Sequence, residues 1–184
     1  MKTLTQNPLP PVLGPLVRYL DQLTGRASLD ELSRLLQESA VTLEDLRAFV
    51  RFDPAHYRRN LVAEGQWYNL LVLCWSSGQR SPIHDHAQSA CAFKVLTGVC
   101  SETPYGFSPC GQVYPLQTTE QLAGAIVATQ DSDTHQVSNL QSAGRDLVTL
   151  HIYSPPLKLM QRFSITGESA GAWTDEEYQS GAGV

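Results

Sequence analysis

From Trp67 onward the sequence is a succession of short runs rich in β-branched and aromatic residues, and this texture limits the folds open to the chain. The runs are YNLLVLCW, AFKVLTGV, GAIVATQ and DLVTLHIYS, and clusters of Gly, Pro, Ser and Asp separate them. Short runs at fairly even spacing, with no helical pattern between them, are typical of a β-sandwich or β-barrel. We therefore predict a mainly β fold in which a barrel takes up residues 56–165.

The first 55 residues carry helical signals instead. Ser28 with Glu31 forms a capping box, and Thr42 with Asp45 has the same spacing in a weaker form. Apolar residues follow each pair at helical spacing, namely Leu29, Leu32, Leu35 and Leu36, then Leu43, Leu46, Phe49 and Val50. We predict a helix after each pair, so that residues 1–55 form a helical preface to the barrel.

Composition and charge exclude several classes of protein. An apolar fraction of 42% and a length of 184 residues suit one globular domain, here 1–184 with an irregular tail at 166–184. No run is apolar for long enough to span a membrane, and the amino terminus lacks the apolar run of a secretory signal, so we expect a cytoplasmic monomer without a membrane partner. The net charge of −5, with Arg58 and Arg59 as its basic cluster, argues against a nucleic-acid partner.

Three histidines in the β region have the spacing of a metal site. His84 and His86 are separated by one residue, so both imidazoles project from the same face if that stretch is a strand. His135 lies far along the chain, but a distant strand of an antiparallel barrel can be the spatial neighbour that completes a triad. Imidazole suits Fe, Zn, Cu and Ni alike. An isolated His-x-His pair could equally be two solvent-facing polar residues, so its context matters.

That context resembles the two motifs of the cupin superfamily. The first motif matches at Gly78, His84, His86, Cys91 and Gly98, with Cys91 where many cupins have Glu, and the second matches at Gly124, His135 and Asn139, with Gln130 and Ser132 in place of its proline and second glycine. The resemblance implies a jelly-roll-like cupin barrel. With Cys91 replacing the carboxylate, three neutral imidazoles would leave a metal its full charge and favour an anionic ligand such as a thiolate. The alternative is Cys91 as a fourth ligand in a closed structural site.

Longer segments resemble the cysteine dioxygenase family. They are YRRNLVAEGQWYNLLVLCW, SPIHDHAQSACAFKVLTG, THQVSNL and TLHIYSPP, which together run from about Tyr57 to Pro156. The resemblance implies Fe(II) held by His84, His86 and His135, and oxidation of L-cysteine with O2 to cysteine sulfinic acid. In this family the substrate binds iron through its thiolate and its amine.

The same resemblance assigns the substrate carboxylate to Arg59, the arginine of the family's YxRN motif. Its planar guanidinium suits a two-point contact with a carboxylate. Tyr57 lies on the same side if the stretch is extended, whereas Arg58 is expected to face away. By itself, Arg59 would be interpreted as a surface charge.

Thr149, His151 and Tyr153 alternate along one predicted strand face and could form a hydrogen-bonded row beside the metal. Ordinary barrel packing is the alternative. The family has a Ser-His-Tyr row here, and Thr149 keeps the hydroxyl of the serine. Members with a cysteine at the position of Cys91 can link its sulfur to the tyrosine equivalent to Tyr153, so we predict that this thioether can form.

Three other functions remain open at this point. One is dioxygenation of another small thiol such as 3-mercaptopropionate, although relatives of that type usually carry Gln where this chain has Arg59. Another is a cupin that binds a metal or ligand without catalysis. A third is a zinc hydrolase, because three histidines and an open position also suit Zn²⁺. We interpret Trp75 as a core residue and leave His56 unassigned.

Overall fold

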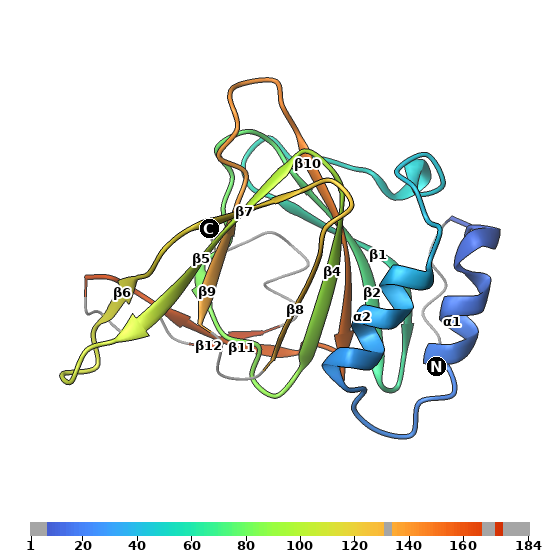
Figure 1. The fold of residues 1–184 in the computed structure, drawn as a ribbon, viewed down its shortest axis with the longest axis horizontal. Helices are drawn as coiled ribbons and strands as arrows, with labels where there is room; N and C mark the ends of the chain where they lie inside the picture. The colour runs from blue at the N-terminus through green and yellow to red at the C-terminus, as the bar shows by residue number, and fades with distance from the viewer. Residues whose placement is uncertain (1–6, 131–133, 167–171, 175–184) are drawn as a thin grey trace.

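The computed structural model describes residues 7–130, 134–166 and 172–174, and it consists of two antiparallel β-sheets with helices on the outer face of one of them (Figure 1). The first sheet has the order β1 (Arg58–Gly65), β2 (Tyr68–Trp75), β10 (Leu147–Ser154), β4 (Ala90–Thr97) and β8 (Ile126–Gln130). The second has the order β12 (Ala172–Thr174), β11 (Leu159–Phe163), β3 (Ile83–His84), β9 (His135–Ser138), β5 (Val99–Phe107) and β6 (Val113–Pro115), with β7 (Thr119–Leu122) also paired to β5. The predicted mainly β architecture is thus confirmed.

The helical elements are η1 (Pro11–Leu13), α1 (Gly14–Leu20), α2 (Leu29–Glu38) and η2 (Arg47–Phe49). The capping box that starts α2 is as predicted, because the Glu31 N–H donates to Ser28 Oγ at 3.2 Å and the Ser28 N–H donates to Glu31 Oε2 at 3.4 Å. The preface is tied to the barrel by the Ala27 N–H, which donates to Ser154 Oγ on β10 at 3.0 Å. None of the described helices is long and apolar enough to cross a membrane.

The helix predicted after Thr42 is only a short 3-10 helix, and no α-helix forms in this segment. Thr42 and Asp45 do exchange hydrogen bonds, but the residues that follow form turns and the short 3-10 helix η2. Their backbone bonds join residues three apart, such as the Phe49 N–H to the Leu46 carbonyl at 2.8 Å. The apolar side chains here also recur every three residues, which matches the 3-10 period better than the α period. The sequence pattern therefore had the right burial and the wrong helix type.

The predicted irregular tail needs a similar correction. Residues 172–174 form the short strand β12, which pairs with β11. A three-residue strand is too short to produce a recognisable alternation in the sequence. The other tail residues beyond position 166 lie outside the described part of the chain.

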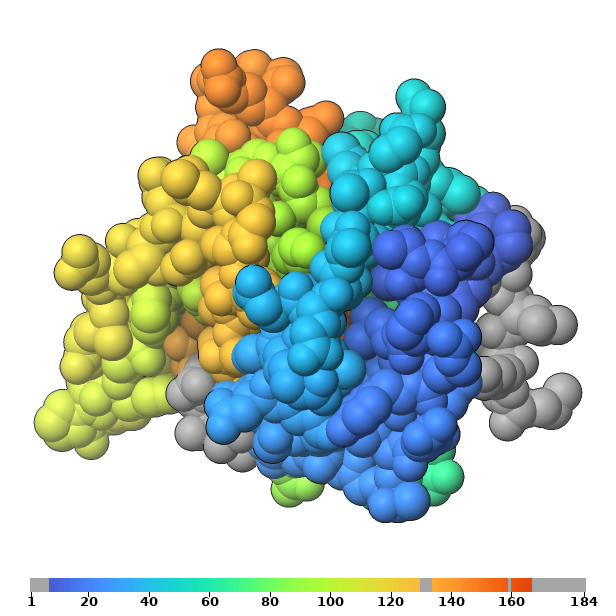
Figure 2. Space-filling view, turned by 45° about the vertical axis from the view of Figure 1, so that its right-hand side comes forward, coloured from blue at the N-terminus to red at the C-terminus, as the bar shows by residue number. Residues whose placement is uncertain are grey.

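Two hydrophobic cores result from the alternation along the first sheet. In β2, Leu70 and Val72 point toward the helices and belong to an outer core, whereas Leu71, Leu73 and Trp75 point between the sheets and belong to an inner core. Figure 2 shows the N-terminal helices, in blue, forming the surface that covers the outer core. Because side chains alternate with a period of two, each strand of this sheet serves both cores at once.

Strand β10 lies in the middle of this sheet, paired with β2 on one side and β4 on the other, and all eight of its residues are buried. Leu150 and Ile152 belong to the outer core, while Tyr153 belongs to the inner one. The polar residues that alternate with them therefore face the space between the sheets.

Candidate metal centre

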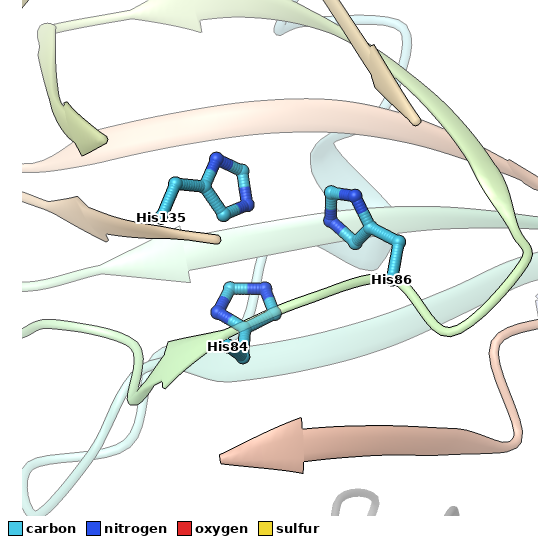
Figure 3. Close-up of side chains that lie close together, drawn as sticks. All are labelled: His84, His86 and His135. Carbon is cyan, nitrogen blue, oxygen red and sulfur yellow. The ribbon is translucent and has the colours of Figure 1, made fainter. Parts of the chain in front are cut away.

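Three buried histidines meet in the space between the two sheets. His84 ends β3 and lies directly opposite His135, the first residue of β9, while His86 follows in the loop after β3. The ring centroids are 4.8 Å apart for His84 and His135, 4.9 Å for His86 and His135, and 5.4 Å for His84 and His86. One potential ligand atom from each lies within 4.8 Å of the others, and Figure 3 shows the rings turned toward a common space. The group can hold a metal ion.

The partners of these histidines on the outer side set which ring nitrogen is available. His84 Nδ1 lies 2.9 Å from the Pro82 carbonyl, and His135 Nδ1 lies 2.6 Å from Glu102 Oε1. Both partners are acceptors, so in the neutral imidazoles each Nδ1 carries the proton and each Nε2 keeps its lone pair. His86 Nδ1 lies 3.4 Å from the Thr129 hydroxyl. His135 Nε2 is fully buried and has no hydrogen-bond partner among the described residues, which fits a metal ligand.

Burial keeps the imidazoles of His84 and His86 neutral. It lowers the pKa of His84 to about 3, and the neighbouring His135 adds to that shift. Burial also holds the pKa of His86 well below its usual value, again with a contribution from His135. Neutral imidazole is the form that binds metal ions, so the site needs no loss of protons from these side chains before a metal binds.

The lowered pKa of His84 predicts how the stability of the metal-free protein changes in acid. In the unfolded chain His84 takes up a proton near pH 6.5, whereas in the folded protein it does so only near pH 3. Between these values the unfolded state binds more protons, so the free energy of unfolding should fall as the pH is lowered from about 6.5 toward 3. Urea unfolding of the metal-free protein at several pH values across this range would measure the change in the free energy of unfolding. His84→Gln should flatten the profile, and an equally steep profile in that variant would contradict the prediction.

A hydrogen-bonded row runs along β10 beside the histidines. Thr149 Oγ1 lies 2.8 Å from His151 Nε2, and His151 Nδ1 lies 3.3 Å from the Tyr153 hydroxyl. Phe93 stacks on the His151 ring at 4.7 Å, and burial, followed by the positive charge of Arg59, keeps the pKa of His151 well below its usual value. The row is thus a chain of neutral groups, with Phe93 packed against its central ring.

Cys91 lies directly opposite Tyr153 in the pairing of β4 with β10. The Tyr153 hydroxyl is hydrogen-bonded to its thiol, and Cys91 Sγ lies 3.9 Å from His151 Nδ1. Burial raises the pKa of Cys91 to about 12, so the thiol is protonated at neutral pH. The group of potential ligand atoms found in the described ranges comprises the three histidines and does not include Cys91. This arrangement does not support Cys91 as a fourth metal ligand.

Arg59 and Tyr57 approach the site from β1 and the residue before it. The Arg59 guanidinium carbon lies 5.2 Å from the centre of the Tyr153 ring, and its positive charge contributes to the lowered pKa values of His84 and His86. Tyr57 is buried and stacks on Trp75 with 4.1 Å between ring centroids. The neighbouring Arg58 is exposed. The structure therefore gathers all nine predicted site residues in one region.

Six of these nine residues line a cavity between the sheets. The cavity is lined by Leu73, Trp75, Ser81, His84, His86, Cys91, Phe93, His135, Val137, His151 and Tyr153. Arg59, Tyr57 and Thr149 do not line the cavity, but each contacts a residue that does. Arg59 lies against the ring of Tyr153, Tyr57 stacks on Trp75, and Thr149 is hydrogen-bonded to His151. The lining is mostly apolar apart from the histidines, which is the usual character of a small-ligand site.

Two further residues belong to the site although the sequence did not point to them. Trp75 is a core residue as interpreted, but its indole N–H also donates to Thr149 Oγ1 at 3.3 Å. Glu102 contacts His135 from the neighbouring strand β5. Of the two, only Glu102 could have been noticed in the sequence, because it is an acidic residue inside a segment that resembles a strand. His56 lies 3.6 Å from the Asp53 carboxylate and has no contact with the histidine group in the described structure.

Comparison with known proteins points to one family. The model of the family "Cysteine dioxygenase type I" matches residues 4–166. A cysteine dioxygenase type 1 of Danio rerio is 32% identical over 166 residues, covering 84% of this chain and 80% of that protein, and the Homo sapiens protein of the same name is 30% identical over 160 residues, with the same coverage. The range matched by the family model includes the barrel, the three histidines and most of the helical preface.

One solved structure with a TM-score of 0.50 agrees on the fold. A crystal structure from Bacillus halodurans superimposes with a TM-score of 0.50 at 19% identity, covering 64% of this chain and 80% of that one. A Klebsiella pneumoniae protein with a double-stranded β-helix domain gives a TM-score of 0.48 at 18% identity, covering 70% of this chain and 92% of that one. Together with the two facing sheets and the family match, the predicted cupin barrel with an N-terminal helical segment is confirmed.

Proposed function

The chain belongs to the type I cysteine dioxygenase family, and on that premise we propose that it is a non-haem Fe(II) enzyme that oxidises L-cysteine with O2 to cysteine sulfinic acid. The observation that carries the proposal is the buried group of His84, His86 and His135, whose potential ligand atoms lie within 4.8 Å of one another inside a cupin barrel. Three imidazole ligands suit iron and leave positions for other ligands.

The metal would be held by these three histidines. When bound there, Fe(II) supplies the chemistry that the side chains lack, because it favours the thiolate form of a thiol and exchanges electrons with O2. The protein's own residues then have to bind the rest of the substrate, keep water out and hold protons in place. The mostly apolar walls of the cavity serve the second of these tasks.

Arg59 is the proposed partner of the substrate carboxylate. Its guanidinium carbon lies 5.2 Å from the centre of the Tyr153 ring, which restricts the side chain, and the planar guanidinium has the geometry for a two-point contact with a carboxylate. Because the side chain is partly buried, a carboxylate paired with it would be shielded from water, which strengthens the contact. Tyr57, stacked on Trp75, is proposed to shape this end of the pocket.

Tyr153 is the proposed proton-bearing group beside the reacting atoms. Burial holds its pKa well above its usual value, so the hydroxyl keeps its proton and can donate a hydrogen bond. The row from Thr149 through His151 fixes the position of that hydroxyl. A donor that is already in place does not have to reorganise when charge develops on the substrate or on oxygen.

We also predict that a thioether between Cys91 and Tyr153 forms during turnover. The two residues are directly opposite each other and their side chains are in contact, so a bond from Sγ to the ring carbon beside the hydroxyl requires little movement. The thiol and the ring each lose one hydrogen, and O2 takes up the two electrons. Peptide mass analysis after turnover with Fe(II) and cysteine should show a linked fraction that lacks two hydrogens. Cys91→Ser should lack it and Cys100→Ser, at another buried cysteine, should retain it; no linked peptide in wild type would contradict the prediction.

Oxygen uptake by ferrous protein with L-cysteine, with the sulfinate product identified by mass, tests the proposal. Cysteamine, homocysteine and 3-mercaptopropionate should be compared in the same assay, and cysteine is expected to have the highest kcat/KM. A higher value for 3-mercaptopropionate would reassign the substrate, and no oxygen uptake with any thiol would favour a non-catalytic cupin. Metal analysis after anaerobic purification should find iron; zinc in its place would favour the hydrolase alternative.

The remaining expectations are proposals of the same kind. We propose that the chain is a single domain over residues 1–184 and acts as a cytoplasmic monomer. The formal net charge of −5 supports the absence of a nucleic-acid partner.

A further inference from the structure

Glu102 is a buried carboxylate that needs a physical explanation. Its side chain is 10% exposed, and its hydrogen-bond partner is His135, whose side chain is 5% exposed. Removing a carboxylate from water is costly unless a strong partner compensates for the lost hydration. The imidazole offers a single N–H to this carboxylate, fewer donors than a Lys or an Arg would offer. Something beyond this hydrogen bond is therefore needed to stabilise the negative charge.

The sheet register makes the contact between Glu102 and His135 systematic. In the pairing of β5 with β9, Glu102 lies opposite Val137 and Pro104 lies opposite His135. Glu102 is thus the diagonal neighbour of His135 on the same face of the sheet, within reach of a long side chain. The Oε1–Nδ1 distance of 2.6 Å is short, as expected when a charged carboxylate accepts a hydrogen bond.

This contact determines the tautomer of His135. The carboxylate can only accept, so Nδ1 carries the proton, and in the neutral ring Nε2 keeps its lone pair. That Nε2 atom is buried without a hydrogen-bond partner among the described residues, on the side where His84 and His86 converge. A metal ion at this point would give Nε2 a partner. Its positive charge, on the far side of the ring, would also stabilise the negative charge of Glu102.

The three histidines are backed unequally. A full carboxylate supports His135, the Pro82 carbonyl supports His84, and the Thr129 hydroxyl supports His86 at the longer distance of 3.4 Å. A carboxylate behind an imidazole raises its basicity and fixes its orientation. His135 is therefore the metal ligand whose orientation is held most firmly by an outer partner.

We propose that Glu102 is a positioning residue of the metal centre, which holds His135 with Nε2 facing the metal and places a negative charge next to the site. A divalent ion together with this carboxylate carries one net positive charge, which a single thiolate neutralises. The proposal rests on the metal site of the proposed function, but not on the thiol that is oxidised.

Two isosteric variants test the proposal. Glu102→Gln keeps the size of the side chain and removes the charge, and Glu120→Gln makes the same change at an exposed position of β7, the strand that also pairs with β5. The probe is Co²⁺, and its affinity is measured by competition with a chromogenic chelator. We expect a roughly 10- to 100-fold weaker affinity in Glu102→Gln, which is the usual effect of losing an outer partner of a ligating histidine. Glu120→Gln should bind as wild type does.

Thermal unfolding with and without Co²⁺ separates this role from a structural one. Glu102→Gln removes a buried charge, so the metal-free variant should unfold at the same temperature as wild type or higher, while Co²⁺ should raise its Tm less. An unchanged Co²⁺ affinity, or a Tm lowered equally with and without metal, would overturn the proposal. If wild type binds no Co²⁺, both the metal centre and this role fail. If it binds Co²⁺ and the iron form oxidises no thiol, only the proposed function fails.

Discussion

His84→Ala is expected to remove the bound metal and, with it, oxidation of cysteine. His84 supplies one of three ligands, and the group of potential ligand atoms found among the described residues contains no fourth side chain that could replace its lost imidazole. Losing a direct ligand should cost more than the roughly 10- to 100-fold drop in metal affinity that follows loss of an outer partner. Iron content after purification and oxygen uptake with cysteine measure the two effects.

His56→Ala is the matched control, because this histidine contacts Asp53 and is not part of the histidine group. It should keep its iron and its activity. Circular dichroism should show that both variants are folded, since His84 contributes little to the outer core. Full iron content in folded His84→Ala would show that the metal lies elsewhere.

Arg59→Ala should lower kcat/KM for cysteine by roughly 30- to 1000-fold, which corresponds to about 2–4 kcal/mol for removing one partner of a buried charged contact. Iron content should stay the same, because Arg59 does not belong to the histidine group. Arg58→Ala changes the adjacent, exposed arginine and should leave the kinetics unaltered. Arg59→Lys should recover only part of the loss, because an ammonium lacks the planar two-point geometry.

Substrate choice makes the experiment on Arg59 specific. Cysteamine has the thiol and the amine of cysteine but no carboxylate, so its turnover should respond much less to Arg59→Ala. Equal losses for cysteine and cysteamine would mean that Arg59 supports the site through Tyr153, against whose ring it lies, rather than through the substrate carboxylate.

Local chemistry explains which features of the fold could be predicted. The run YNLLVLCW identified a strand because its apolar, strand-favouring residues and the turn residues that follow it lie in one short segment. Ser28 and Glu31 identified a helix start because both hydrogen bonds of the capping box are local. The histidine pair was visible for the same reason, since both residues lie in one short segment.

The features that could not be predicted depend on tertiary structure. The segment after Thr42 has apolar positions that fit an α-helix or a 3-10 helix, and the packing of Leu46 and Phe49 decides between them. Glu102 becomes a partner of His135 only through the register of β5 with β9, and no local pattern encodes that register. Trp75 was correctly interpreted as a core residue, but its hydrogen bond to Thr149 depends on the pairing of β2 with β10 and could not be seen in the sequence.

The separation of the outer core from the inner core has a consequence for how the protein can change. The outer core, under the helices, is built from side chains that never face the metal centre, whereas the inner core surrounds it. Substitutions in the outer core under α2 can therefore change the thermal stability of the protein while the cavity at the metal centre keeps its shape. Because the two cores lie on opposite faces of one sheet, stability and substrate preference can be engineered by separate sets of substitutions.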